Sequence, residues 1–517
     1  IGSPRWARHH DHMASMTSLV SAKGRLFYIF DEGETASIQL PSRWKLIARD
    51  AFNGTILWKR DIDQWNTRKY PLKSGPAHLV RRLVAVGDRV FVTLGIDAPT
   101  VALNAATGET VMTFEGSEYT KEVLVSDGVL FLVAGNERSR LPDFRRESTN
   151  VWANRDRANT EWGWTGTSRR ILAYDVESGR QLWKIDAPVA PCSLAVDGTR
   201  AVFHDGQKLV SLDRRDGSIA WQAENTPLAR VILTNTGPRV LIYGDVVLFA
   251  GGNGKMSGWE AATGKKVWER QHKPSGHNSL KDLFVADGLA WTGDIAGGRP
   301  TGGTFTGYDP FTGDQKREFP IDIELNWFHH RCYPAKATQK YILTARNGTE
   351  FVDLEAEHWE PHHWVRGGCI YGVMPCNGMM YASMDACGCQ LEAKLDGFKA
   401  LAPGPVTLPK DLDLSGEARL QKGRAYGAVH GPVAGVEDWP TFRHDPSRSG
   451  ASSTKVEAEL KQTWKTRLGG RLSAPTAAAG MLFVASIDSH TVHALDAESG
   501  DSAWSYTVGA RVDSPPT

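Results

Sequence analysis

The chain has 517 residues, of which 60 are Lys or Arg and 59 are Asp or Glu. This near-neutral balance excludes a chain-wide preference for nucleic acid or for an anionic membrane surface, so we expect neither as a partner. No run of residues reaches the roughly 18 to 20 apolar positions that a membrane helix needs, so no membrane span is expected. The abundance of glycine (52) and tryptophan (18) among short apolar runs is typical of repeated β-hairpins.

Residues 1–16 form a polar entry segment, in which no charged start precedes an apolar stretch as it would in a signal peptide. The segment contains three imidazoles, His9, His10 and His12, which are candidate ligands for a zinc, copper or calcium ion. On a strand, His10 and His12 would share one face. A polar loop at the entry to the fold explains the same residues, and that alternative stays open.

A repeat begins in the next segment and is the strongest signal in the sequence. An apolar strand runs into Asp50, glycine follows at Gly54, and a second strand delivers Trp58. The carboxylate can accept N–H bonds in the turn, glycine can adopt its positive φ, and the indole suits the space between packed sheets. The same spacing returns four more times, so the predicted docking residues are Trp58, Trp183, Trp221, Trp268 and Trp504.

Another strand pair precedes most copies of the repeat, so one unit has about four strands, the size of a propeller blade. Weaker copies carry Met112 and Arg317 in place of the tryptophan, and degenerate units are expected at residues 341–354 and 378–395. The sequence therefore predicts an all-β propeller of about eight four-stranded blades over residues 17–400. We expect each tryptophan to hold its own blade together. An unrelated series of hairpins in a β-sandwich is the alternative.

A long insertion, residues 135–170, interrupts the third unit and is rich in Arg and Trp. Connections of this length are uncommon in compact domains and often carry function. A surface loop that packs on the rim of the propeller is the alternative interpretation.

The degenerate units contain most of the cysteines and several histidines. Thiolates and imidazoles at close quarters suit zinc or copper, although the spacings match no standard zinc pattern. The alternative is one or two disulfides that tie these blades together, which would favour a periplasmic or otherwise exported protein. The candidates are His329, His330, Cys332, His362, His363, Cys369, Cys376, Cys387 and Cys389.

Residues 401–437 are rich in Pro and Gly and are interpreted as a linker. A further unit occupies residues 438–517 and stops shortly after its turn glycine, Gly500. It either closes the first ring or begins a second, truncated propeller, and we expect the chain to be a fragment of a longer protein.

The Ala-x-Asp-x-x-x-Gly-x-x-x-Trp repeats and the segments at residues 2–12, 48–58, 439–445 and 510–517 resemble PQQ-like (quinoprotein-type) β-propeller repeat proteins. In some large bacterial members, a methyltransferase-like domain precedes the propeller. The resemblance covers most of the chain and implies a missing N-terminal region. Active enzymes of the family use pyrroloquinoline quinone (PQQ) with Ca²⁺ or a similar cation, and a disulfide between adjacent cysteines.

This chain departs from the pattern of those enzymes. It has no Cys-Cys pair, the nearest arrangement being Cys387-Gly-Cys389, and no C-x-x-C-H haem site. PQQ is therefore not expected. The sequence favours a binding or scaffold platform, with a protein or a small-molecule ligand on a propeller face. A quinoprotein-type oxidoreductase resembling alcohol dehydrogenases is the first alternative, and a metal-dependent enzyme that uses the His and Cys clusters is the second.

Overall fold

The computed structural model gives the arrangement of most of the chain. The described residues are 16–34, 40–67, 77–145, 153–154, 164, 166–228, 239–251, 254–272, 283–293, 304–322, 333–344, 348–362, 364–368, 372–383, 395, 398–404, 420, 422–423, 426, 435, 437–509 and 512–517. Compactness divides the chain into two units, one of Ile1–Ala48 with Trp58–Ala402 and one of Arg49–Leu57 with Pro403–Thr517.

The described residues form nine antiparallel sheets, each made of strands that are consecutive in the sequence. The first four blades, in chain order, are β1 (Met16–Ala22), β2 (Arg25–Asp31), β3 (Trp44–Asp50) and β4 (Ile56–Asp61); β5 (Leu83–Val86), β6 (Arg89–Thr93), β7 (Thr100–Asn104) and β8 (Thr110–Thr113); β9 (Thr120–Ser126), β10 (Val129–Ala134), β11 (Arg169–Asp175) and β12 (Gln181–Ala187); and β13 (Ala195–Val196), β14 (Arg200–His204), β15 (Leu209–Asp213) and β16 (Ile219–Gln222). Two short 3₁₀ helices lie in the connections, η1 (Ala77–Arg82) and η2 (Leu141–Asp143).

The next four blades complete the first set. They are β17 (Arg239–Tyr243), β18 (Val246–Ala250), β19 (Lys255–Glu260) and β20 (Lys266–Gln271); β21 (Leu283–Ala286), β22 (Leu289–Gly293), β23 (Thr304–Tyr308) and β24 (Gln315–Pro320); β25 (Lys336–Ala337), β26 (Tyr341–Leu343), β27 (Thr349–Asp353) and β28 (His358–His362); and β29 (Val373–Cys376), β30 (Met379–Ala382) and β31 (Lys399–Leu401). Blade 8 thus has three strands among the described residues. Its third strand is β31, later in the chain than the 390–395 segment that the sequence suggested.

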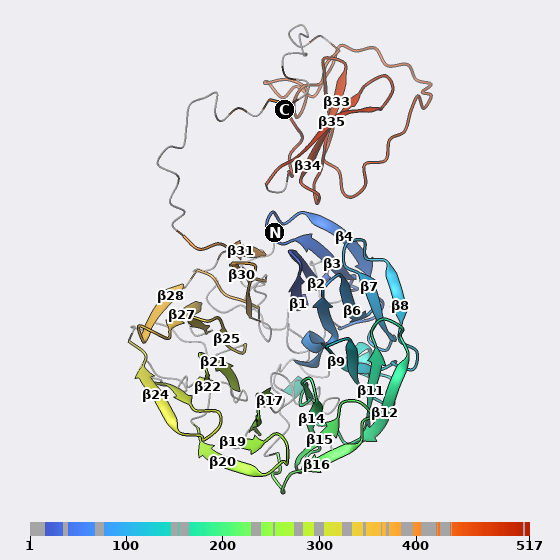
Figure 1. The fold of residues 1–517 in the computed structure, drawn as a ribbon. Helices are drawn as coiled ribbons and strands as arrows, with labels where there is room; N and C mark the ends of the chain where they lie inside the picture. The colour runs from blue at the N-terminus through green and yellow to red at the C-terminus, as the bar shows by residue number, and fades with distance from the viewer. Residues whose placement is uncertain are drawn as a thin grey trace. The chain divides into compact units, whose positions relative to one another are not determined.

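These eight blades form a closed ring, with the first strand of each blade innermost (Figure 1). Inner strands of neighbouring blades lie side by side, for example β1 with β5 and β13 with β17. Blade 8 closes the ring directly on blade 1, because β29 contacts β1 and the Asn377 amide donates a 3.0 Å hydrogen bond to Ser21 Oγ. The chain is therefore a β-propeller, as the repeat predicted.

The repeated turn has the geometry that its residue types predict. In blade 1, Asp50 Oδ1 accepts the N–H groups of Phe52 and Asn53 at 2.9 Å each, and Gly54 has φ +76°. Its equivalents Gly108, Gly179, Gly217, Gly264 and Gly313 all have φ between +70° and +75°. Only glycine takes this left-handed conformation without strain.

The tryptophans hold neighbouring blades together, which corrects the expectation that each one closes its own blade. Trp183, on the fourth strand of blade 3, lies on Gly217 in the turn of blade 4 and donates a 2.8 Å hydrogen bond to the Arg214 carbonyl. A Cβ on Gly217 would be 2.7 Å from the indole, so the contact requires glycine. The other pairs are Trp58 on Gly108, Met112 on Gly179, Trp221 on Gly264 and Trp268 on Gly313.

The junction between blades 6 and 7 uses a different pair of residues. Arg317 occupies the tryptophan position, and its guanidinium donates a 2.5 Å hydrogen bond to the Leu354 carbonyl, the same turn carbonyl that the indoles reach elsewhere. The turn of blade 7 has Glu357 where the others have glycine, with φ +55°. The Cβ of Glu357 leaves no room for an indole. The narrower side chain of Arg317 therefore occupies the tryptophan position.

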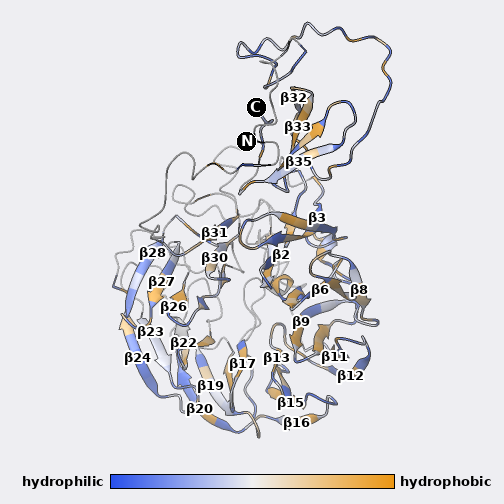
Figure 2. Cartoon of the chain, turned by 45° about the horizontal axis from the view of Figure 1, so that its top comes forward, coloured by the Kyte–Doolittle hydropathy of each residue, from blue (hydrophilic) through white to orange (hydrophobic). Residues whose placement is uncertain are grey.

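Burial follows the order of strands within a blade. The second strand β18 is wholly buried, whereas the outer strand β20 is buried mainly through Trp268. In Figure 2 the outer strands β12, β20 and β24 are mostly hydrophilic, while hydrophobic residues lie on strands nearer the axis. The hydrophobic clusters contain residues of adjacent blades, so the core lies between the sheets.

The second unit contains the ninth sheet, of β32 (Thr476–Ala478), β33 (Met481–Ser486), β34 (Thr491–Asp496) and β35 (Ser502–Thr507). Its turn glycine, Gly500, has φ +75°. The residue docked on Gly500 is Trp464, which the sequence analysis missed. Trp504, the predicted docking residue, lies on β35 with its ring 6.0 Å from that of Phe483.

Candidate functional site

The antiparallel order of strands gives the ring two different faces. One face, which we call the turn face, has the hairpins between first and second strands and the Asp-x-x-x-Gly turns between third and fourth. The other, the connection face, has the loops between second and third strands and the links from each blade to the next. The docking contacts occupy the turn face.

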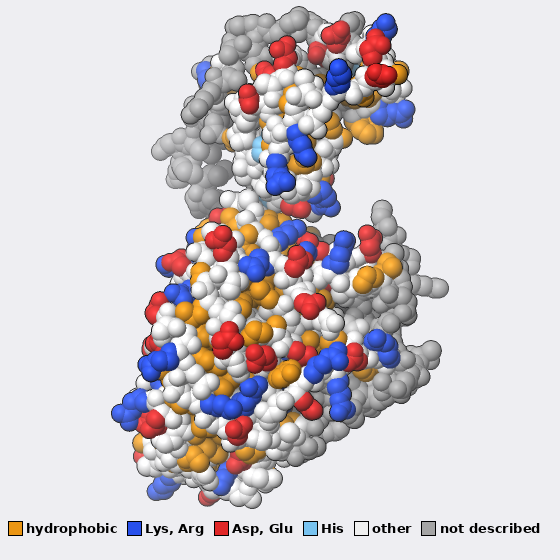
Figure 3. Space-filling view, turned by 90° about the vertical axis from the view of Figure 1, so that its right-hand side faces the viewer, with side chains coloured by type: hydrophobic (Ala, Val, Ile, Leu, Met, Phe, Trp, Pro, Cys, Tyr) orange, Lys and Arg blue, Asp and Glu red, His pale blue; other side chains and the backbone are white. Residues whose placement is uncertain are grey.

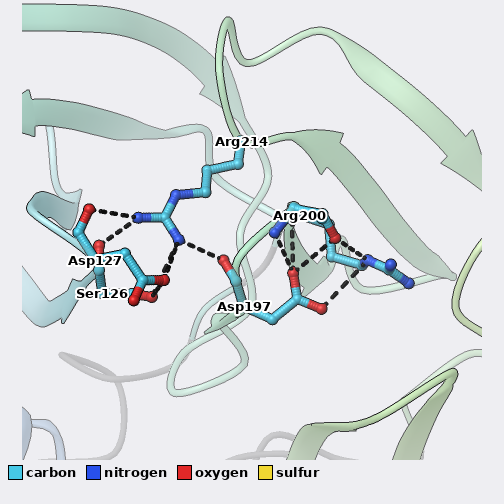
Figure 4. A network of polar contacts seen from close by, with 6 residues as sticks. Ser126, Asp127, Asp197, Arg200 and Arg214 are labelled. Carbon is cyan, nitrogen blue, oxygen red and sulfur yellow. Dashed lines mark hydrogen bonds and ion pairs between the residues drawn. The ribbon is translucent and has the colours of Figure 1, made fainter.

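Polar groups on the turn face are used to join blades. Arg214, in the turn of blade 4, donates to Asp127 Oδ2 at 2.9 Å, to Ser126 Oγ at 3.1 Å and to the Asp197 carbonyl at 2.7 Å (Figure 4). Arg200 lies beside the same Asp197, with its Nε 3.3 Å from the carboxylate. Arg214 is only 7% exposed, and its hydrogen bonds reach from blade 4 to blade 3. We interpret this network as structural.

The connection face contains a cluster of charged side chains and one thiol that are buried or half-buried. Each member lies at or near the beginning of a strand, or in the link that precedes an innermost strand: Arg81, Glu122, Arg169, Cys192, Arg239 and Lys336. They come from blades 3, 5 and 7 and from the links into blades 2 and 4. Because all innermost strands start at the connection face, these side chains interact although they are far apart in the sequence.

Positive charge dominates this cluster. Arg81 forms an ion pair with Glu122, which is 3% exposed. Although burial disfavours the charged guanidinium, the Glu122 carboxylate raises the pKa of Arg81. Within the described part of the chain, neither Arg169 nor Arg239 forms an ion pair. The adjacent Arg170 differs, because it donates to three backbone carbonyls, of Gly116, Glu118 and Gly135.

The pKa values report the same crowding of cations. Burial, together with the charge on Arg81, lowers the pKa of Arg239 to about 10. Burial and the nearby Arg239 lower the pKa of Lys336 to about 8. Burial raises the pKa of the Cys192 thiol, so it stays protonated near neutral pH. Among the described residues, Arg169 and Arg239 add positive charge without an ion pair, and we interpret the cluster as suited to an anionic group.

Sequence reasoning missed this cluster, because its members are widely separated in the sequence and belong to different blades or links. A signal was nevertheless present. When the repeats are aligned on their turns, Arg239 and Lys336 fall on the first residue of an innermost strand, and Arg81 lies two residues before one.

The insertion in blade 3 packs on the connection face, where it is described. Leu141 joins the hydrophobic cluster of blades 1 and 2, and Ser139 N–H donates a 2.9 Å hydrogen bond to Asp97. Trp164 lies against Gly206 of blade 4, where a Cβ would approach its ring to 2.8 Å.

Two of the predicted metal ligands can be placed. His362 is on β28, with ring contacts to Phe351 and Trp364, and Cys376 is a free thiol at the end of β29 beside blade 1. No group of three potential ligands and no disulfide is present among the residues that the structure describes. The remaining candidates lie outside the described residues: His9, His10, His12, His329, His330, Cys332, His363, Cys369, Cys387 and Cys389.

Comparison with known proteins assigns the chain to a family. The family model described as outer membrane protein assembly factor BamB matches residues 42–161, 163–288 and 454–517, together more than half of the chain. The chain belongs to this family. A family member from Shewanella oneidensis, outer membrane protein assembly factor BamB, is 23% identical over 261 residues, which cover 46% of this chain and 56% of that protein.

Other relatives share shorter regions. Quinohemoprotein alcohol dehydrogenase ADH IIB of Pseudomonas putida is 29% identical over 168 residues, 27% of this chain and 24% of that protein. Serine/threonine-protein kinase AfsK of Streptomyces coelicolor is 29% identical over 156 residues, 30% of this chain and 17% of that protein. The chain thus spans between about a sixth and just over half of the curated relatives' lengths.

Two solved structures match part of the chain. The quinohemoprotein alcohol dehydrogenase from Comamonas testosteroni matches with a TM-score of 0.46 and 13% identity, covering 78% of this chain and 76% of that one. The computationally designed Ika8 protein matches with a TM-score of 0.48 and 13% identity, covering 77% and 98%.

Acidic and basic side chains are interspersed on the side of the molecule drawn in Figure 3. Among the described residues, no helix has the length and apolar character to cross a membrane.

Proposed function

We propose that the chain is a binding propeller that holds an anionic group of its partner at the connection face. The observation that carries this proposal is the excess of cations in the connection-face cluster, in which Arg169 and Arg239 have no ion-pair partner among the described residues. Burying a charge without a counter-ion is costly, and a bound carboxylate would relieve that cost. The family supports a platform, because a member's name describes an assembly factor.

The proposal is tested by titrating the protein with citrate and, in a separate experiment, with a short oligoglutamate peptide. Both probes present carboxylates, but only the peptide resembles an acidic protein segment. For whichever of the two probes binds the wild type, we expect Arg239→Gln to weaken binding about tenfold, equivalent to about 1.4 kcal/mol. Arg215→Gln is the matched control, because Arg215 is an exposed turn-face arginine paired with Asp213. Equal affinities for wild type and Arg239→Gln would contradict the proposal.

A quinoprotein-type oxidoreductase is the second candidate, because the same cations suit the carboxylates of PQQ. In this second candidate, Arg169 and Arg239 would hold the carboxylates of the quinone. The described residues supply no group of three metal ligands to hold the accompanying cation. A titration with PQQ, with and without Ca²⁺, separates the candidates when an alcohol and an artificial electron acceptor are then added. Quinone binding with dye reduction supports the enzyme, and carboxylate binding without turnover supports the platform.

A further inference from the structure

Glu122 is the acidic member of the connection-face cluster among the described residues. It is the third residue of β9 and is 3% exposed. Arg81 reaches it from η1, which packs against β9, and the two side chains form an ion pair. The Glu122 carboxylate therefore already has a cation of its own. Arg169 and Arg239, in contrast, form no ion pair within the described part of the chain.

The two arginines without an ion pair come from different blades but share their surroundings. Arg169 begins β11 in blade 3, and Arg239 begins β17 in blade 5, which lies beside β13 of blade 4. Both guanidinium groups interact with Glu122 and with Cys192, which is in the link from blade 3 to blade 4. Because burial raises the pKa of the Cys192 thiol, this group adds no charge near neutral pH.

The balance of charge in this group of side chains defines what a ligand must bring. Arg81 and Glu122 cancel, and Arg169 with Arg239 leaves two positive charges. A charge removed from water is costly unless it is paired. A ligand with one carboxylate leaves one arginine unbalanced, and a third carboxylate would face Glu122 without a cation of its own. Lys336 interacts with Arg239 and is unchanged in every comparison below.

We infer that Glu122 sets the charge of the ligand, so that the connection-face cluster selects a group with two carboxylates. Glu122 is an internal anion that occupies Arg81 and keeps it from the ligand. The two carboxylates come from a free dicarboxylate or from two acidic side chains of a partner protein. This inference rests on the proposed function and goes further, because it names the charge of the ligand and the residue that determines it.

Two series of probes, titrated calorimetrically at neutral pH and low salt, test the charge of the ligand. Butyrate, glutarate and tricarballylate carry one, two and three carboxylates on similar carbon chains. Capped peptides with one, two and three consecutive glutamates present the same charges as a protein segment would. In the series that binds, we expect two carboxylates to bind the wild type about tenfold more tightly than one. Binding in the first series indicates a free dicarboxylate, and binding in the second alone indicates a partner protein.

Removing the charge of Glu122 should change the selectivity. Glu122→Gln retains a side-chain oxygen for the bond from Arg81 but frees the guanidinium charge for the ligand. We expect the preference for three carboxylates over two to rise about tenfold in this variant. Glu118→Gln is the matched control, because it removes a carboxylate from the link into blade 3, outside the cluster, and it should leave the preference unchanged. If Glu122 were only structural, its substitution would weaken all three probes equally, and that result overturns the inference.

The opposite change is made by Arg81→Gln. Glu122 then competes with the ligand for Arg169 and Arg239, so the preference for two carboxylates over one should fall to about threefold or less. Combining Arg81→Gln with Glu122→Gln leaves two positive charges again and should restore the wild-type preference. This comparison keeps the test decisive if Glu122→Gln alone does not fold. A preference that stays the same in Arg81→Gln and in the double variant overturns the inference.

The inference and the proposed function fail in different ways. If probes bind the wild type but one carboxylate binds as tightly as two in both series, the cluster holds anions without selecting their charge. The inference is then wrong and the proposed function stands. If no probe of either series binds the wild type, both are wrong.

Discussion

The junction between blades 6 and 7 offers a direct test of the docking rule, because its two exceptional residues should be coupled. Glu357 has φ +55° in a turn where the other intact copies have glycine. A left-handed conformation costs a non-glycine residue about 1–2 kcal/mol. We therefore expect Glu357→Gly to change the free energy of unfolding by about +1 kcal/mol, after allowing for the greater backbone entropy of glycine in the unfolded chain.

The reverse substitution should fail alone and succeed in combination. At the glycine turns a Cβ would lie 2.4 to 2.7 Å from the docked indole, so Arg317→Trp beside Glu357 cannot dock and also loses the bond to Leu354. We expect this single variant to destabilise the protein by about 1–3 kcal/mol. With glycine at 357 the indole fits, and burying roughly 100 Å² of apolar surface contributes about 2.5 kcal/mol. The double variant should then be at least as stable as the wild type.

The assay is a double-mutant cycle, with urea unfolding followed by circular dichroism for the wild type, the two single variants and the double variant. The expected coupling energy is about 2–4 kcal/mol, well above the roughly 0.5 kcal/mol within which independent changes add. Glu355→Gly is the matched control, since Glu355 is in the same turn without a positive φ. Additive effects of Glu357→Gly and Arg317→Trp would refute the argument that the turn residue determines the docking residue.

Three further outcomes are expected. In a urea titration, Trp221→Ala should lower the free energy of unfolding by about 3–5 kcal/mol, because it leaves a cavity at the blade junction and removes the donor to the Ala261 carbonyl. Trp364→Ala, at a residue that is 47% exposed, should have a small effect in the same titration. Citrate affinity, measured calorimetrically, should fall as pH rises through about 8, because the pKa of Lys336 is lowered to about 8 and its positive charge is lost above that value; in Lys336→Gln the fall should be absent. Burial lowers the pKa of His204 below its ordinary value of 6.5, so just below that pH the unfolded chain binds a proton that the folded chain does not. The free energy of unfolding should therefore decline as pH falls below about 6.5, and the decline should be shallower in His204→Gln.

The blades could be predicted from the sequence because each repeat contains the residues that form its own turn. Asp50 and Gly54 are local requirements, so the hairpin can be predicted without knowing what surrounds it. Even the replacement of tryptophan by Arg317 was visible from spacing. The partner of each tryptophan was not visible, because Trp183 and Gly217 belong to different repeats and spacing alone does not show which turn an indole reaches.

The candidate site was harder to predict for a related reason. Arg81, Arg239 and Lys336 are unremarkable in the sequence, and their proximity depends on closure of the ring, which places the first strand of each blade innermost. Trp464 was missed because its repeat lacks the preceding turn. A tryptophan followed 34 to 50 residues later by a turn glycine, as with Trp183 and Gly217 or Trp58 and Gly108, would have found it.

The two faces of the ring are under different physical constraints, and this difference favours binding at the connection face. On the turn face, a glycine with positive φ, an indole and a backbone carbonyl must meet at most junctions, so side chains there have little freedom. The connection face has no such requirement, and its loops vary from a few residues to the long insertion in blade 3.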